Sequence, residues 1–335
     1  MKIHYPEYYK TFSCLAGSCP DSCCHQWEVD VDPAAADYYR HLPGALGDRL
    51  RAVLKDGEDG WASMVLTEDR RCPMWRQDGL CRIQAELGHD ALCGTCQEFP
   101  RISHDHGDFM ELGLEMSCPE AARIILSNPH AKWITEEVPG GDEPEYEAQS
   151  MEVSRISRLK AVELALDETV SVGEAMASVL LYSGIVQYAT DWKEIREFDR
   201  EERLAKYRCH TADIALEEVW APYGDLEILT DRWKKILERG PVEAPWKPEH
   251  RALLRYLIDR YWYQATYDGE LLMRCIFIIM SCLVIRDMGG DPVDMAQLYS
   301  KEIENDADNV EALYDYIQNA DPMYTTKLLQ LLLKK

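Results

Sequence analysis

The sequence lacks a long hydrophobic run. Its longest stretch of uncharged apolar residues, 275–285, is too short to cross a bilayer and predicts a buried helix instead. Residues 1–12 lack the apolar segment and the cleavage site of a secretory signal. We therefore expect no transmembrane segment and a cytoplasmic location.

Basic residues are scarce. The chain has 36 Lys and Arg against 60 Asp and Glu, which gives a net charge of −24. Such a field repels phosphate backbones and anionic lipids, so we expect no nucleic-acid partner. The acid excess attracts cationic partners, such as a lysine-bearing protein surface, and it also keeps a protein in solution.

Cysteine is sparse in the last two-thirds of the chain, where Cys209, Cys275 and Cys282 are isolated. On apolar helix faces such residues are typically small buried side chains. The other nine of the twelve cysteines precede residue 119. In a reducing compartment they are not expected to form structural disulfides.

Two regions of different character follow one another along the chain. Residues 1–128 contain short apolar runs interrupted by Pro, Gly and Asp. Helical spacing and turn signals there predict helices at 33–41, 44–55, 81–88 and 119–127. The strand candidates are 62–67 and 109–114.

The second region follows an acidic Pro/Gly-rich stretch, 129–150, which predicts a linker. Apolar residues then recur every three or four positions, which predicts helices at 151–167, 172–190, 192–207, 211–220, 225–238, 248–267, 269–287, 292–304, 309–319 and 322–333. The fold class is mainly α: a small irregular cysteine-rich metal-binding N-terminal domain (1–128), the linker, and an all-helical bundle or array domain (151–335).

The nine N-terminal cysteines form three groups: Cys14, Cys19, Cys23 and Cys24; Cys72 and Cys81; Cys93, Cys96 and Cys118. Cys93 and Cys96 form a CxxC pair, whose spacing lets two thiolates bind one metal or cluster. Cys19 and Cys23 can act in the same way if the chain coils between them. Side chains of neighbouring residues usually diverge, so Cys23 and Cys24 are not expected to bind the same ion.

Three interpretations of the nine cysteines remain open: a zinc site, an iron–sulfur cluster, and small buried side chains that bind nothing. A tetrahedral zinc site is typically built from two CxxC pairs, and the second pair is missing. An iron–sulfur cluster tolerates irregular spacing, and nine thiols are enough for more than one site. His25, His104 and His106 are further candidate ligands. A thiol–disulfide oxidoreductase is not favoured, because no thioredoxin-like pattern surrounds the CxxC pair.

Four segments resemble a known family: GSCPDSCCHQW (17–27), RCPMWRQDGLC (71–81), CGTCQEFPR (93–101) and MSCPEAARIIL (116–126). They are similar to the cysteine-cluster superfamily of zinc- and iron-chelating proteins and, within it, to the flagellin lysine-N-methylase family. The residues that match the superfamily are Cys19, Cys23, Cys24, Cys72, Cys81 and Cys96. Those that match the methylase branch are Cys14, Cys93 and Cys118.

This resemblance implies an enzyme that moves a methyl group from S-adenosylmethionine to lysine side chains of flagellin or another protein. It implies a [4Fe–4S] cluster as cofactor, with zinc as the alternative. The other function open at this point is a non-catalytic metal-binding module with a helical interaction domain.

Methylation of a lysine requires the neutral amine, so a basic group must accept its proton. Glu111, Glu115 and Glu120 lie near the last cysteine group and are the candidates for this role. The sequence contains neither the CxxxCxxC signature of radical S-adenosylmethionine enzymes nor a GxGxxG loop after a strand. The residues that bind S-adenosylmethionine are therefore not identified.

Overall fold

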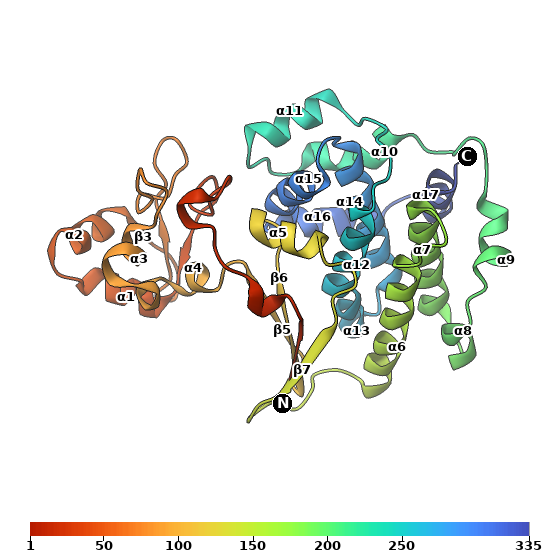
Figure 1. Cartoon of the computed structure of the whole chain (residues 1–335), viewed down its shortest axis with the longest axis horizontal. Helices are drawn as coiled ribbons and strands as arrows, with labels where there is room; N and C mark the ends of the chain where they lie inside the picture. Colours follow the sequence, from red (N-terminus) through yellow and green to blue (C-terminus); the bar gives the residue numbers. More distant parts are fainter. Residues whose placement is uncertain (335) are drawn as a thin grey trace.

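The computed structural model describes residues 1–334 and consists mainly of helices, which confirms the mainly α class (Figure 1). A small lobe lies at one end of the long axis, a mixed sheet lies next to it, and a large helical lobe fills the other end. We call residues 7–100 the cysteine lobe. The domain boundaries at 128 and 150 stay predictions.

The cysteine lobe has its own small core. Its helices are α1 (Pro33–His41), α2 (Gly44–Val53), α3 (Arg82–Leu87) and α4 (Gly94–Glu98). Its short sheet has the order β2-β4-β3, with β2 (Asp30–Val31), β3 (Leu54–Asp56) and β4 (Ala62–Met64). Tyr39, Leu50 and Met74 are buried at its centre. The helix predicted at 44–55 ends at Val53, because the chain continues directly into β3.

A four-stranded sheet joins the two lobes, and most of it was not predicted. Its order is β5-β6-β1-β7, with β5 (Arg101–Asp105), β6 (Phe109–Leu114), β1 (Lys2–Pro6) and β7 (Trp133–Glu137). Strand β1 runs parallel to β6 and antiparallel to β7. Residues 129–150 are therefore not a linker throughout, because β7 is an edge strand whose backbone groups pair with β1.

The helical lobe contains α5 and all the later helices. These are α5 (Pro119–Leu126), α6 (Ala148–Ala165), α7 (Val172–Tyr188), α8 (Trp192–Arg196), α9 (Arg200–Leu204), α10 (Leu216–Trp220), α11 (Asp231–Arg239), α12 (Glu249–Tyr261), α13 (Ala265–Asp268), α14 (Leu271–Asp287), α15 (Pro292–Tyr299), α16 (Ala307–Gln318) and α17 (Tyr324–Leu332). Short 3₁₀ segments connect several of them.

Several predicted helices differ from those observed. The helices predicted at 211–220 and 225–238 begin only at Leu216 and Asp231, and the one predicted at 248–267 is interrupted by a 3₁₀ turn at Trp262–Gln264. Residues 192–207 form α8, α9 and a 3₁₀ turn instead of one helix, because Asp191 and Asp199 each cap a separate N-terminus. The helix predicted at 292–304 changes character within its length. Its first part is α15, and Ser300–Glu304 continue it as a π-helix.

Helix α14 is the centre of the helical lobe. It contains the longest apolar run and packs against α7, α12, α15 and α16. Cys275 and Cys282 are fully buried in it, as predicted for isolated cysteines. No helix within residues 1–334 has both the length and the apolar character that crossing a membrane requires.

A buried ion pair connects the sheet to the helical lobe. The guanidinium of Arg158 on α6 donates two hydrogen bonds, of 2.7 and 2.6 Å, to the carboxylate of Glu111 on β6. Both side chains are buried, and the guanidinium also lies 3.5 Å from the ring centroid of Tyr263. This pair fixes the sheet against α6.

We expect Arg158→Met to lower the free energy of unfolding by about 3–5 kcal/mol, because Glu111 would remain buried without its partner. The double variant Arg158→Met/Glu111→Gln removes both charges of the ion pair, so its free energy of unfolding should fall much less. Urea unfolding followed by circular dichroism measures both. Equal losses in the two variants would contradict this role of the ion pair.

Candidate metal-binding site

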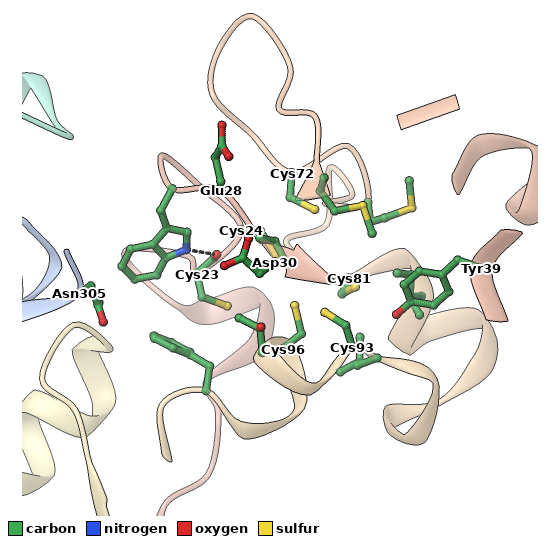
Figure 2. A pocket seen from close by; sticks show the side chains of 18 residues that line it. Cys23, Cys24, Glu28, Asp30, Tyr39, Cys72, Cys81, Cys93, Cys96 and Asn305 are labelled. Atoms are coloured by element: carbon green, nitrogen blue, oxygen red, sulfur yellow. Dashed lines mark hydrogen bonds between the residues drawn. The ribbon is translucent and has the colours of Figure 1, made fainter. Parts of the chain in front are cut away.

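Six cysteines line one cavity of about 260 Å³ in the cysteine lobe. Figure 2 shows that they come from separate segments and that their side chains face a common space. The six are Cys23, Cys24, Cys72, Cys81, Cys93 and Cys96. The sequence analysis had assigned these six cysteines to one site, although Cys23 and Cys96 are 73 positions apart in the chain.

Backbone pairing brings the first cysteine group to Cys72. The N–H of Cys72 donates to the carbonyl of Cys24 at 2.8 Å, and that of Gln26 donates to the carbonyl of Arg70 at 2.7 Å. Cys23 and Cys24 lie in a turn, so both side chains line the cavity. The structure thus places both of them at one site. That they bind different atoms of one cluster, or different ions, stays a prediction.

A tight hairpin connects Cys72 to Cys81. Trp75 and Cys81 form an isolated bridge, and the turn contains Gly79 at φ +79°. A Cβ on Gly79 would lie 2.9 Å from the Cα of Gly17. The two glycines therefore let the segment before Cys19 pack directly on this hairpin.

Asp32 positions the CxxC pair. One carboxylate oxygen accepts from the N–H of Ala35 and caps α1, and the other accepts from the N–H of Gly94 at 2.9 Å. These hydrogen bonds, the one from Gly94 first, lower the pKa of Asp32. A single ionised side chain thus holds α1 and the start of α4 together. The sequence analysis did not identify Asp32.

Neighbouring thiols change one another's acidity in two sets. The Cys24 thiol lowers the pKa of Cys23 and of Cys72, to about 7 for Cys72. The neighbouring Cys96 thiol lowers the pKa of Cys93. Several thiols that face one space are the kind of donor set that soft metals and iron–sulfur clusters prefer.

The remaining three N-terminal cysteines lie outside this cavity. Cys118 directly precedes α5 and is buried in the helical core. Burial raises its pKa to about 12, and the nearby Cys19 and Cys14 thiols add to this rise. Cys14, Cys19 and Cys118 therefore form a second group, and a role for them as ligands stays a prediction.

The thiols are distributed around the cavity and do not meet at one point. Among residues 1–334, no three His, Cys, Asp or Glu side chains converge closely enough to hold one metal ion. The six thiols instead surround a volume, and a cluster uses iron atoms at different corners of its frame. The donor chemistry and its distribution fit a thiolate-bound iron–sulfur cluster.

None of the three candidate bases lines this cavity. Glu111 is paired with Arg158, Glu115 accepts from the hydroxyl of Ser117, and Glu120 accepts two hydrogen bonds from Arg123. These pairings give each carboxylate a structural partner.

The histidines named as further ligands also lie elsewhere. His25 packs near Trp75, with ring centroids 5.8 Å apart, and it does not line the thiol cavity. His104 and His106 line a different cavity, between the sheet and α12.

The cysteine lobe is docked on the helical lobe beside the thiols. Asp21 accepts two hydrogen bonds of 2.8 and 2.9 Å from the ammonium of Lys301, whose side chain is 1% exposed. Gln297 donates to the same carboxylate and to the carbonyl of Ser117. Asn305 from the helical lobe reaches the edge of the thiol cavity (Figure 2). The sequence carried no signal for these contacts.

Comparison with known proteins gives partial relatives. The flagellar biosynthetic protein FliU of Salmonella muenchen is 31% identical over 131 residues, which are 38% of this chain and 78% of FliU. Lysine-N-methylases of Salmonella typhimurium and Salmonella choleraesuis are each 30% identical over 139 residues, which are 39% of this chain.

The aligned part spans only 34% of each lysine-N-methylase. No family model matches the sequence, and no solved structure matches it significantly. Because most of FliU is covered at 31% identity, the chain belongs to the family of the flagellar biosynthetic protein FliU.

Proposed function

We propose that this protein is an S-adenosylmethionine-dependent protein-lysine N-methyltransferase whose cysteine lobe holds a [4Fe–4S] cluster. Its acceptor is a lysine of flagellin or of another protein. The observation that carries the proposal is the cavity lined by six thiols in a chain similar to lysine-N-methylases.

In the proposed reaction, the lone pair of a neutral lysine amine attacks the methyl carbon of the sulfonium. The new N–CH₃ bond forms as the S–CH₃ bond breaks, S-adenosylhomocysteine leaves, and the amine gives up a proton to a base. The chain must therefore hold an ammonium, remove its proton and exclude water from the sulfonium.

When bound, a cluster held by these thiolates would cross-link the segments that carry them, and it would supply either structural support or an iron that binds the amino and carboxylate groups of S-adenosylmethionine. The protein's own residues keep the thiols in position. Asp32 fixes the CxxC pair, and Trp27 donates from its indole N–H to the carbonyl of Cys23 at 2.7 Å.

The second candidate function is a non-catalytic metal- or cluster-binding module with a helical interaction domain. It is favoured by the pairing of Glu111, Glu115 and Glu120 with Arg158, Ser117 and Arg123. A base for lysine must then come from elsewhere in the chain, or the chain has none.

We expect Cys96→Ser to remove bound iron and sulfide and to destabilise the cysteine lobe, because metal binding and folding are coupled. Cys209→Ser is the matched control, since Cys209 is half-buried in the helical lobe and donates only to the carbonyl of Gln330. Iron and sulfide analysis and visible absorption after anaerobic reconstitution measure the outcome. Full iron binding in Cys96→Ser would contradict the assignment of Cys96 as a ligand. A colourless protein that contains zinc would show that the metal is zinc and not iron.

We expect the reconstituted protein to transfer a labelled methyl group from S-adenosylmethionine to lysines of flagellin. Scintillation counting and mass spectrometry of the acceptor measure the transfer. We expect the Cys96→Ser variant to transfer the methyl group at least about tenfold more slowly. This loss corresponds to an activation barrier that is higher by about 1.4 kcal/mol. If the metal-loaded protein labels no lysine in flagellin or in other proteins of the same cell, the methyltransferase proposal is wrong. The non-catalytic module is then the function that remains.

A further inference from the structure

A second cavity, of about 270 Å³, adjoins the thiol cavity. The two share Trp27 from the cysteine lobe and Asn305 from the helical lobe. The second cavity therefore lies where the lobes meet, directly beside the six thiols. We call it the acidic pocket, because four carboxylates line it: Glu227, Glu302, Asp306 and Asp308.

The acidic pocket has a strong excess of negative charge. Lys301 is the one basic side chain among its lining residues, and its ammonium is already paired with Asp21. A concave site of this kind concentrates cations. Acidic residues are common in this chain, however, so the charge alone does not assign a ligand.

The surroundings of Glu302 indicate which kind of ligand the acidic pocket binds. Its side chain is 1% exposed, and one carboxylate oxygen accepts from the N–H of Leu229 at 2.8 Å. The other oxygen has no hydrogen-bond partner. Burial raises the pKa of Glu302, an effect that Thr230, Leu229 and Lys301 offset in part. Glu302 is thus a lining residue of the cavity with one buried carboxylate oxygen that still lacks a donor, which suits it to a cationic donor.

Trp27 provides an aromatic wall for such a donor. Its indole N–H is held by the carbonyl of Cys23, so the ring position is fixed. The ammonium of Lys301 lies 4.9 Å from the ring centroid, which shows that this ring already packs against one alkylammonium. A carboxylate and an aromatic ring together are the usual recognition elements for a lysine side chain.

The backbone around Glu302 is unusual as well. Glu302 lies in the π-helix Ser300–Glu304 that extends α15. Single π-helical turns are rare and occur frequently at functional sites. Here the turn carries two neighbouring residues with separate tasks, Lys301 bound to Asp21 and Glu302 in the wall of the pocket.

We infer that the acidic pocket takes the primary ammonium of the acceptor lysine, with Glu302 as the group that accepts its proton. This inference rests on the proposed function and adds the place where the acceptor binds. The proton passes from the ammonium to the carboxylate of Glu302, and the free lone pair then forms the N–CH₃ bond as the S–CH₃ bond of S-adenosylmethionine breaks. The pocket adjoins the thiol cavity, so acceptor and cluster would be neighbours.

The test uses the reconstituted full chain and n-butylammonium, which reproduces the end of a lysine side chain. Saturation-transfer NMR measures its binding, with 1-butanol as the neutral isostere. We expect n-butylammonium to bind and 1-butanol not to bind. Glu302→Gln should weaken n-butylammonium at least about tenfold, the size of losing a hydrogen bond to a charged group.

The matched control is Asp315→Asn. Asp315 is an exposed carboxylate on α16, the helix that also carries Asp308, but it does not line the pocket. This variant changes the net charge by the same amount and should leave binding unchanged. If Glu302→Gln does not fold, the exposed pair Glu227→Gln/Asp308→Asn replaces it and should also weaken binding.

Absence of n-butylammonium binding, equal binding of 1-butanol, or equal losses in Glu302→Gln and Asp315→Asn would overturn the inference. Kinetics separate this failure from failure of the proposed function. If the protein binds n-butylammonium but transfers no methyl group, the ammonium site stands and the methyltransferase proposal falls. If it methylates flagellin and Glu302→Gln has an unchanged KM for flagellin and an unchanged kcat, the acceptor site lies elsewhere.

Discussion

The ion pair between Asp21 and Lys301 is the contact on which the arrangement of the two lobes depends. Lys301 is almost completely buried, and removing Asp21 would take away the carboxylate that its ammonium directly contacts, at a cost of several kcal/mol. The pair therefore holds the first cysteine group at one position on the helical lobe. Trp27 and Asn305 meet beside it, and both cavities of the interface share these two residues.

The local parts of this structure follow from the sequence. The helix at 33–41 and the strand at 109–114 were predicted with their observed bounds, because helical spacing, alternation and capping residues are local signals. The mixed sheet was missed because β1 pairs with β6 and β7, more than a hundred residues away, and a strand of five residues carries little pattern of its own. Long-range pairing is a tertiary property that no local window contains.

The candidate site was also predicted in part. The CxxC pair and the grouping of cysteines indicated that distant thiols converge, and six of them do. Their separation from Cys14, Cys19 and Cys118 had no sequence signal, because it depends on α5 packing in the helical core. Asp32, Trp27 and Glu302 were missed for the same reason, since a carboxylate or an indole acquires its role only from the segment that packs against it.

The connection of the cysteine lobe to the sheet has a consequence for the order of assembly. The lobe leaves the sheet after β1 and returns to it at β5, and both strands belong to one sheet in which β6 lies between them. The lobe is thus an insertion whose two ends are held by the larger fold. Closing a loop of this length costs only slightly more conformational entropy than closing a short loop. The sheet and helices can therefore fold while the cysteine lobe is still unfolded. Binding of the proposed cluster would then be the last step of folding.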